Sequence, residues 1–441
     1  MFDTQTYAIL MLVGFFALLM IGIPVATTLA TVGLVFGYLG FGDTLFSLLP
    51  ARFYGIVAGY QWMAIPLFVF MGVMLEKSRL ADDLLDVMGH IAGGVRGGMG
   101  VGIILFGVLM GATTGIVGAT VITLGLLTLP TLIKRGYNKS IACGAICASG
   151  TLGQIIPPSL ILILLSDIMQ LSVGTLFAAA VGPGLLLSGV YIIFLLVLGW
   201  LKPELMPALP QDERDGVSRR ELWIRFWKVV VPPILLVVAV LGSIVGGVAA
   251  PTEAASMGAV GSVLITVFSR RFTMKILKDV ALETAKITAI MMLILMLAQV
   301  FALAFRGLHG EDLITKMFDL LPGGVNSDIW FMMALIFILG FFIEWIEISY
   351  IAVPLFLPVL LAQGVDPVWL AMLITVNLQS SFLTPPFGWA LFYLKGVAPP
   401  EVTIKDIYKG VVPFIIMQGA TLALVFFYPQ IALWLPKAIG W

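Results

Sequence analysis

Long apolar segments separated by short polar turns run through the whole chain. In the first part they cover 6–21, 25–39 and 62–75, lengths that approach the ~20 apolar residues of a membrane-spanning helix. Between them, 43–59 alternates polar and apolar positions at helical spacing and is expected to lie along a membrane interface. The pattern predicts an all-α protein that crosses a membrane several times.

One apolar run is too long for a single crossing. No charged residue occurs over the 33 residues of 101–133, which as one helix would measure about 50 Å against a membrane core of about 30 Å. Basic residues flank the run on both sides, at Arg96 and at Lys134 and Arg135, and basic flanks favour the same, cytoplasmic, side. We therefore predict a re-entrant helical hairpin over 100–136, with its tip in the small residues of 112–119.

The next apolar segment, 140–166, carries helix breakers at its centre. Gly150 and Gly153 precede the pair Pro157 and Pro158, and proline removes a backbone donor and clashes with the preceding turn. This segment is predicted to be a broken transmembrane helix whose freed carbonyl groups find another partner. A further apolar segment at 171–201 completes this part of the chain.

The same arrangement occurs twice. Pro130, Pro157 and Pro158 recur as Pro358, Pro385 and Pro386, each 228 positions later. The repetition predicts the following organisation: repeat one at 1–201, a cytoplasmic linker at 202–228, and repeat two at 229–441 with a hairpin at 328–364 and a broken helix at 367–394. Duplication of interrupted apolar segments indicates a transporter and its binding site.

Charge placement predicts the orientation. With the N-terminus outside the cytoplasm, 20 of the 24 lysines and arginines fall on the cytoplasmic side, as the positive-inside rule favours. Four remain outside: Arg52, Arg306, Lys316 and Lys437. In this layout the second repeat enters the membrane from the opposite side, so the two repeats have inverted topology.

Composition excludes several classes of protein. Hydrophobic residues make up 60% and charged residues 11% of the chain, against roughly 25% charged in soluble domains, so lipid is its main solvent. The net charge is zero and no basic, aromatic-rich stretch is present, so no nucleic-acid partner is expected. The two histidines lie in polar connections, which disfavours a membrane enzyme, and no cofactor is expected.

Polar residues at the hairpin tips and breaks are the candidate site, because irregular backbone at membrane depth is tolerated where it is buried or lines a cavity. A lone hydroxyl in a membrane helix usually bonds to its own helix instead. Glu344 lies at the second tip, where it either functions, or has a structural role in which it caps the following helix arm or reaches solvent from a shallow tip. Glu347 is expected to be structural. The hydroxyl and amide candidates are Thr113, Thr114, Thr151, Ser159, Asn377, Ser380, Ser381 and Thr384.

The motifs resemble those of the large membrane subunit, DctM type, of tripartite ATP-independent periplasmic (TRAP) transporters. They are GATTGIVGAT at the first tip, ASGTLGQIIPPS at the first break, APTEAA opening repeat two, GFFIEWIEISYIAVPLFLP at the second tip and VNLQSSFLTPPFG at the second break. The resemblance implies an elevator-type importer in the bacterial inner membrane with a periplasmic N-terminus. It also implies coupling to sodium, a small four-helix membrane subunit and a periplasmic binding protein that delivers a small carboxylate.

The resemblance also implies the site residues. Sodium would bind at the first break near Thr114, Gly153, Ile156 and Pro158, and at the second near Phe342, Ser381, Thr384 and Pro386. Substrate would bind between the tips, and the predicted residues there are Thr113, Thr114, Gly115, Thr151, Ser159, Glu344, Asn377 and Ser380. An alternative is a cation–proton or anion exchanger of similar architecture, which would depend on a buried acid such as Glu344.

Overall fold

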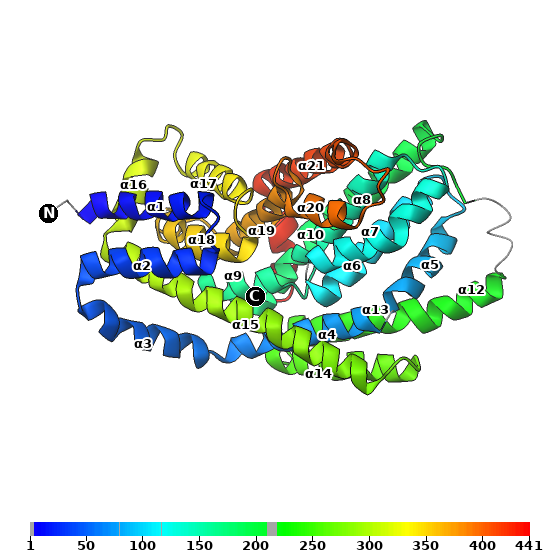
Figure 1. Cartoon of the computed structure of the whole chain (residues 1–441), viewed down its shortest axis with the longest axis horizontal. Coiled ribbons are helices and arrows are strands. Elements are labelled where there is room, and N and C mark those ends of the chain that lie inside the picture. The colour runs from blue at the N-terminus through cyan, green and yellow to red at the C-terminus, as the bar shows by residue number, and fades with distance from the viewer. Residues whose placement is uncertain (1–3, 79, 116, 210–217) are drawn as a thin grey trace.

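All regular elements in the described part of the chain are helical (Figure 1). The computed structural model describes residues 4–78, 80–115, 117–209 and 218–441, without the side chains of residues 4, 61, 80–82, 113 and 114. Among these residues, seven helical segments are long and apolar enough to cross a membrane, and one of them runs from Arg219 to Val245. The predicted all-α membrane fold is confirmed.

The first half has hairpin and broken-helix elements in the predicted order. Its helices are α1 (Thr4–Met20), α2 (Val25–Phe41), α3 (Thr44–Val57), η1 (Tyr60–Met63), α4 (Ala64–Lys77), α5 (Leu80–Ala92), α6 (Gly98–Thr114), α7 (Val117–Lys134), α8 (Lys139–Thr151), η2 (Leu152–Gln154), α9 (Leu160–Ile168) and α10 (Val173–Leu201). The pair α6 and α7 forms the first hairpin, and α8, η2 and α9 form the first broken helix.

The second half repeats these elements. Its helices are α12 (Arg219–Arg225), the π-helical turn η3 (Phe226–Val230), α13 (Val231–Val245), α14 (Pro251–Phe268), α15 (Met274–Gly307), α16 (Gly310–Asp319), α17 (Val325–Leu339), α18 (Trp345–Ala362), α19 (Pro367–Leu383), α20 (Trp389–Val397), α21 (Ile404–Phe427) and α22 (Gln430–Ala438). Here α17 and α18 form the hairpin, and α19 and α20 form the broken helix.

The helices form two layers (Figure 1). In the scaffold layer, α2 and α4 pack on α15, α4 on α14, and α13 on α14. In the hairpin layer, both arms of the first hairpin pack on α8, α20 packs on α7, and α21 packs on α8 and α19. The layers meet where α15 contacts α18 and where α4 contacts α6.

Two stretches differ from the sequence expectation. The basic residues Arg270, Arg271, Lys275 and Lys278 are typical of an amphipathic connector separate from the next span, but α15 is one helix of 34 residues. It contains no proline, and no glycine before its last residue, so nothing in its backbone chemistry interrupts it. The charged linker likewise ends earlier than 228, because α12 begins at Arg219 and continues through η3 into α13. Charge opposes insertion into lipid but does not oppose a helix.

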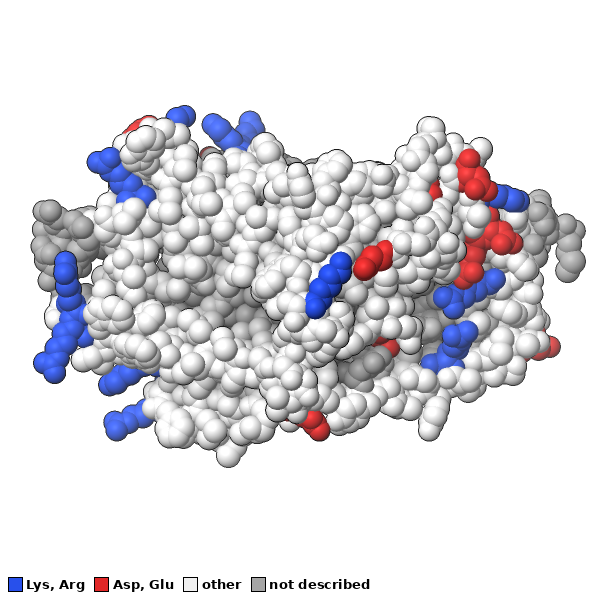
Figure 2. Space-filling model, turned by 180° about the vertical axis from the view of Figure 1, so that it is seen from behind, with Lys and Arg blue, Asp and Glu red and all other residues white. Residues whose placement is uncertain are grey.

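Charged side chains gather at the two ends of the long axis (Figure 2). We call these the α1 end, where the N-terminus lies, and the α12 end. The α12 end, on the left of Figure 2, shows mainly lysine and arginine. The α1 end, on the right, carries acidic groups as well, and few charges lie between the two ends. This separation is typical of a protein that spans a bilayer along that axis.

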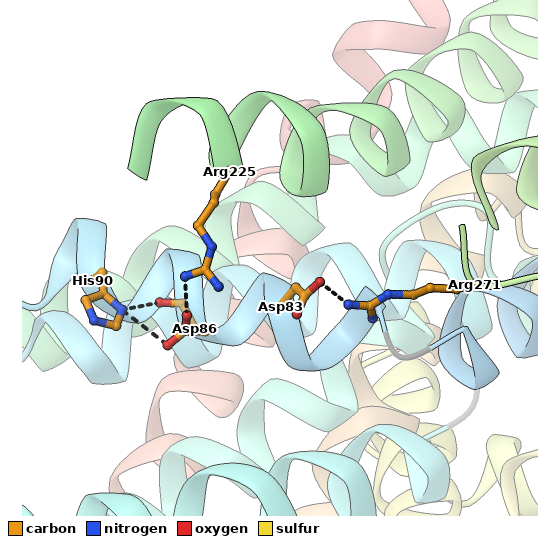
Figure 3. Close-up of polar contacts among 5 residues, drawn as sticks. All are labelled: Asp83, Asp86, His90, Arg225 and Arg271. Carbon is orange, nitrogen blue, oxygen red and sulfur yellow. Dashed lines mark hydrogen bonds and ion pairs between the residues drawn. The ribbon is translucent and has the colours of Figure 1, made fainter. Parts of the chain in front are cut away.

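Ion pairs tie α5 to both neighbouring segments at the α12 end (Figure 3). Arg225 of α12 contacts Asp86 at 2.9 Å, and His90 Nδ1 lies 3.3 Å from the same carboxylate. Arg271, in the turn between α14 and α15, pairs with Asp83 and also donates to the Ser78 carbonyl at 3.3 Å. These contacts fix the connection that leads into the first hairpin.

We expect Arg271→Ala to lower the midpoint of thermal unfolding by several degrees. The guanidinium is only about one-third exposed (32%), and a hydrogen bond to a charged group contributes about 1.5–3 kcal/mol. The measurement is thermal unfolding in detergent, with Lys275→Ala as the control because Lys275 is exposed. Equal midpoints for the two variants would show that the Arg271 contacts contribute nothing.

Candidate functional site

The first hairpin turns at Gly115 and places its tip against the first broken helix. Gly115 has φ +62°, and its N–H donates to the Gly111 carbonyl at 3.0 Å. A Cβ atom at Gly115 would lie 3.2 Å from Leu160 Cγ, so the tip lies at the start of α9. The side chains of Thr113 and Thr114, both predicted ligands, lie outside the described residues.

The arm α6 meets the first break backbone to backbone. A Cβ atom at Gly153 would lie 2.7 Å from Gly111 Cα, a separation that real Cβ atoms do not show. One turn earlier the Ser149 hydroxyl donates to the Ile103 carbonyl at 2.6 Å. A Cβ atom at Gly107 would overlap this hydroxyl, so the contact requires glycine there. Small residues that allow such close approach are typical of helix pairs in membranes.

Unpaired carbonyl groups gather at the first break. Within the described residues, no donor reaches the carbonyl oxygens of Gly153, Ile156 or Pro158. The Ser159 hydroxyl donates to the Gln154 carbonyl at 2.5 Å. A buried carbonyl without a partner costs free energy, and unwound carbonyls are the groups that coordinate sodium in membrane transporters. The three residues belong to the predicted first ligand set, and their carbonyl oxygens accept no hydrogen bond in the described part of the chain.

The second break is similar in shape but its oxygens are already bonded. The carbonyls of Ser381 and Thr384 accept backbone N–H groups at 3.3 and 3.0 Å, and that of Pro386 accepts the Tyr408 hydroxyl at 2.9 Å. Of the predicted second set, only the Phe342 carbonyl has no donor among the described residues. Because more of its carbonyl groups are already bonded, the second candidate cation site is not equal to the first. Each break contains a cis prolyl bond, at Pro158 and Pro386.

The two breaks touch at equivalent positions. Gln379 Nε2 donates to Thr151 Oγ1 at 3.4 Å, and these residues are 228 positions apart, which is the offset of the repeat. Equivalent residues contact each other where a pseudo-twofold axis passes. Both polar atoms of Gln154 and the Gln379 Oε1 atom are buried there without a partner. Sequence reasoning missed both glutamines, although a glutamine amide at membrane depth is itself a signal.

Most predicted hydroxyls bond to their own helix. Thr151, Ser380, Ser381 and Thr384 donate to carbonyls three or four residues earlier, at 2.6–2.9 Å. Each hydroxyl oxygen keeps lone pairs for a cation or ligand. The Asn377 amide donates to the Met333 carbonyl at 2.7 Å and Asn377 is 2% exposed, so it ties α19 to α17.

Tyr393 lies between the two hairpin tips. Its hydroxyl is 3.5 Å from Glu344 Oε1 at the second tip, and a Cβ atom at Gly118, beside the first tip, would lie 3.2 Å from its ring. Sequence reasoning missed Tyr393 because α20 and α7 are far apart along the chain. Tyr393 therefore lies beside both tips.

Glu347, which is expected to be structural, is buried at the start of α18. It is 5% exposed, and its Oε2 atom is buried without a partner. Its position in the first turn of α18 places it near the positive end of that helix dipole. Glu344, the residue preceding α18, is the more accessible of the two.

The comparisons with known proteins identify the family. The sequence model of the family described as "Tripartite ATP-independent periplasmic transporter, DctM component" matches residues 12–431. The chain belongs to the DctM family. This confirms the resemblance in its motifs and establishes a multi-pass membrane permease of TRAP transporters rather than an enzyme.

Relatives and a solved structure agree with this assignment. The C4-dicarboxylate TRAP transporter large permease protein DctM of Pseudomonas aeruginosa is 31% identical over 386 residues, covering 86% of this chain and 87% of the relative. The ectoine TRAP transporter large permease protein TeaC of Halomonas elongata is 28% identical, covering 97% and 98%. The crystal structure of the Alcanivorax borkumensis YdaH transporter shares the fold with a TM-score of 0.64 at 15% identity, covering 94% and 97%.

Proposed function

We propose that this DctM-family chain imports a small organic acid, driven by a sodium gradient. The observation that carries the proposal is that three carbonyl groups at the first break, those of Gly153, Ile156 and Pro158, accept no hydrogen bond in the described residues. An all-oxygen, uncharged ligand set suits sodium. No group of three or more histidine, cysteine or acidic side chains that could hold a metal occurs in the described residues.

The substrate site lies, in this proposal, between the tips. Glu344 and Tyr393 offer an acceptor and a donor there, and the half-helices that begin after the breaks offer their positive dipole ends to a carboxylate. The proposed substrate residues also include Gly115, Thr151, Ser159 and Ser380, at the first tip and the two breaks. The substrates for which the relatives are named, C4-dicarboxylates and ectoine, are small molecules that carry carboxylate groups.

Transport would proceed by movement of the hairpin layer against the scaffold layer. A periplasmic binding protein would deliver substrate, and a small four-helix membrane subunit would complete the complex. The gathering of basic residues at the α12 end supports placing that end in the bacterial cytoplasm and the α1 end in the periplasm (Figure 2). The contact between Thr151 and Gln379 supports the inverted relation of the repeats.

Thermal unfolding of the purified protein in sodium, potassium or choline chloride tests the coupling ion. A ligand that binds only the folded protein stabilises it by about 2.7 kcal/mol at 100 times its Kd. We expect a sodium-specific rise of the midpoint that Thr384→Ala reduces only in part, because the freer carbonyls lie at the other break. An equal midpoint in all three salts would refute sodium coupling.

The exchanger alternative depends on the acids of the second tip. The observation that favours it is the Glu347 Oε2 atom, which is buried without a partner, because buried acids within a membrane are typical of proton relays. An exchanger would show no sodium-specific shift, and instead a midpoint whose dependence on pH disappears in Glu347→Gln.

A further inference from the structure

A polar cavity of about 240 Å³ lies between the layers, and none of its wall residues belongs to the predicted sites at the tips and breaks. The scaffold layer contributes α3 and α15 to its wall, and the hairpin layer contributes the end of α9 and one arm of the second hairpin, α18. The cavity lies near the α1 end. One of its wall residues, Arg306, is in the last turn of α15, and the chain continues from there into α16, which lies beside α1 (Figure 1). The polar wall residues are Arg52, Asp167, Gln170, Gln299, Arg306 and Tyr350.

The two arginines offer donors to an anion. Within the described residues Arg52 has no ion pair or hydrogen bond. Arg306 uses its Nε atom for Glu311 at 3.2 Å, which leaves the terminal nitrogens of the guanidinium group, and a guanidinium fork matches a carboxylate. Arg52 and Arg306 are two of the four basic residues outside the cytoplasmic set, so they are placed where an incoming anion would meet them.

A buried hydroxyl on the same wall lacks a partner. Tyr350 is 3% exposed, and its hydroxyl makes no hydrogen bond in the described structure. Buried polar groups are almost always bonded, and Tyr350 belongs to the cavity wall, so its unpaired hydroxyl is a donor that a molecule bound in the cavity can take up. Asp167 adds an acceptor to the wall, which suits a hydroxyl or ammonium group on that molecule.

We infer that this cavity is a second, outer binding site for a small carboxylate that also carries a hydroxyl or amino group. Arg52 and Arg306 take the carboxylate, Tyr350 donates to it, and Asp167 accepts from the other group. The inference rests on the proposed function for its substrate class and its periplasmic side, but the cavity is separate from the tips. Since both layers line it, the site exists in the arrangement of layers seen here.

The test is protection of a cysteine placed in the cavity. Ala302 lines the cavity and is half-buried, and both natural cysteines are buried, so Ala302→Cys adds one reactive thiol to the full chain. Its labelling rates with a sulfonate-bearing and a trimethylammonium-bearing methanethiosulfonate are compared. Ser47→Cys, exposed on the same helix as Arg52, is the control.

We expect the anionic reagent to react faster than the cationic one with the thiol of Ala302→Cys, and Arg52→Gln to shift that ratio at least severalfold. Ser47→Cys should show no such change. Malate, which carries carboxylates and a hydroxyl, should protect the cavity thiol, and Arg52→Gln should raise the protecting concentration about tenfold or more. Tyr350→Phe should weaken protection without lowering the unfolding midpoint, because its hydroxyl has no partner in the described part of the protein.

Further variants separate this site from the tips and from lipid. Protection that persists in Thr384→Ala and fails in Arg52→Gln supports the outer site. Protection lost only in Thr384→Ala, or seen only with phosphatidylglycerol and not with malate, would overturn it. If the unfolding midpoint shifts specifically in sodium but malate gives no protection, the outer site is overturned and sodium coupling is not. If malate protects but the midpoint does not shift in sodium, sodium coupling is overturned and the outer site is not.

Discussion

Replacement of Gly153 by alanine is expected to remove most sodium-specific stabilisation and to lower sodium-driven uptake at least about tenfold. The added Cβ atom would lie 2.7 Å from Gly111 Cα. A Cβ atom is fixed to its own backbone and Gly111 Cα is a backbone atom, so neither can rotate away. The arm α6 must therefore separate from the first break, which displaces the carbonyls of Gly153, Ile156 and Pro158. Uptake into proteoliposomes with the partner proteins, and the midpoint shift in sodium chloride, measure the two effects.

Gly189→Ala is the matched control for this substitution. Gly189 lies inside α10, and a Cβ atom there meets nothing within 4 Å. Alanine in a helix interior is favoured over glycine by about 1 kcal/mol, so this variant should retain uptake and gain slightly in stability. A sodium response in Gly153→Ala as large as in Gly189→Ala would contradict a cation site at the first break.

The sequence predicts the hairpins and breaks well because each depends on local chemistry. An uncharged run too long for one crossing indicated the first hairpin, and paired prolines indicated the ends of α8 and α19. The lengths of α12 and α15 were harder to predict, because charged residues were interpreted as ends of helices. A charge determines depth in the membrane, whereas glycine and proline determine where a helix stops.

The site was predicted at its motifs and missed at its tertiary contacts. Motif residues such as Gly153 are found from sequence because a break requires them locally. Tyr393 and Gln379 are recognised only once α20 meets α7 and the two breaks meet each other. The inequality of the two breaks also depends on tertiary structure, because Tyr408 occupies the Pro386 carbonyl from a different helix. Sequence symmetry alone predicts two equal cation sites.

Glu344→Gln is expected to raise the KM for uptake by about tenfold to a hundredfold, because a hydrogen bond to a charged group contributes about 1.5–3 kcal/mol. Glu344 precedes α18 at the second tip, 3.5 Å from the Tyr393 hydroxyl. In the proposed site its carboxylate accepts a hydrogen bond from a donor group of the substrate. Glutamine keeps the size of the side chain and removes the charge, so the fold should be unaffected. Initial rates of uptake across a range of substrate concentrations measure the change.

Glu347→Gln, three residues further along and inside α18, separates an effect on substrate recognition from an effect of lost charge. Its carboxylate is buried without a partner at Oε2, so removing the charge should raise the unfolding midpoint and leave KM near that of the unmodified protein. If both variants raise KM equally, the helix end responds to net charge and Glu344 makes no specific contact. If Glu347→Gln alone stops transport, the buried acid carries the coupling proton and the exchanger alternative replaces sodium import.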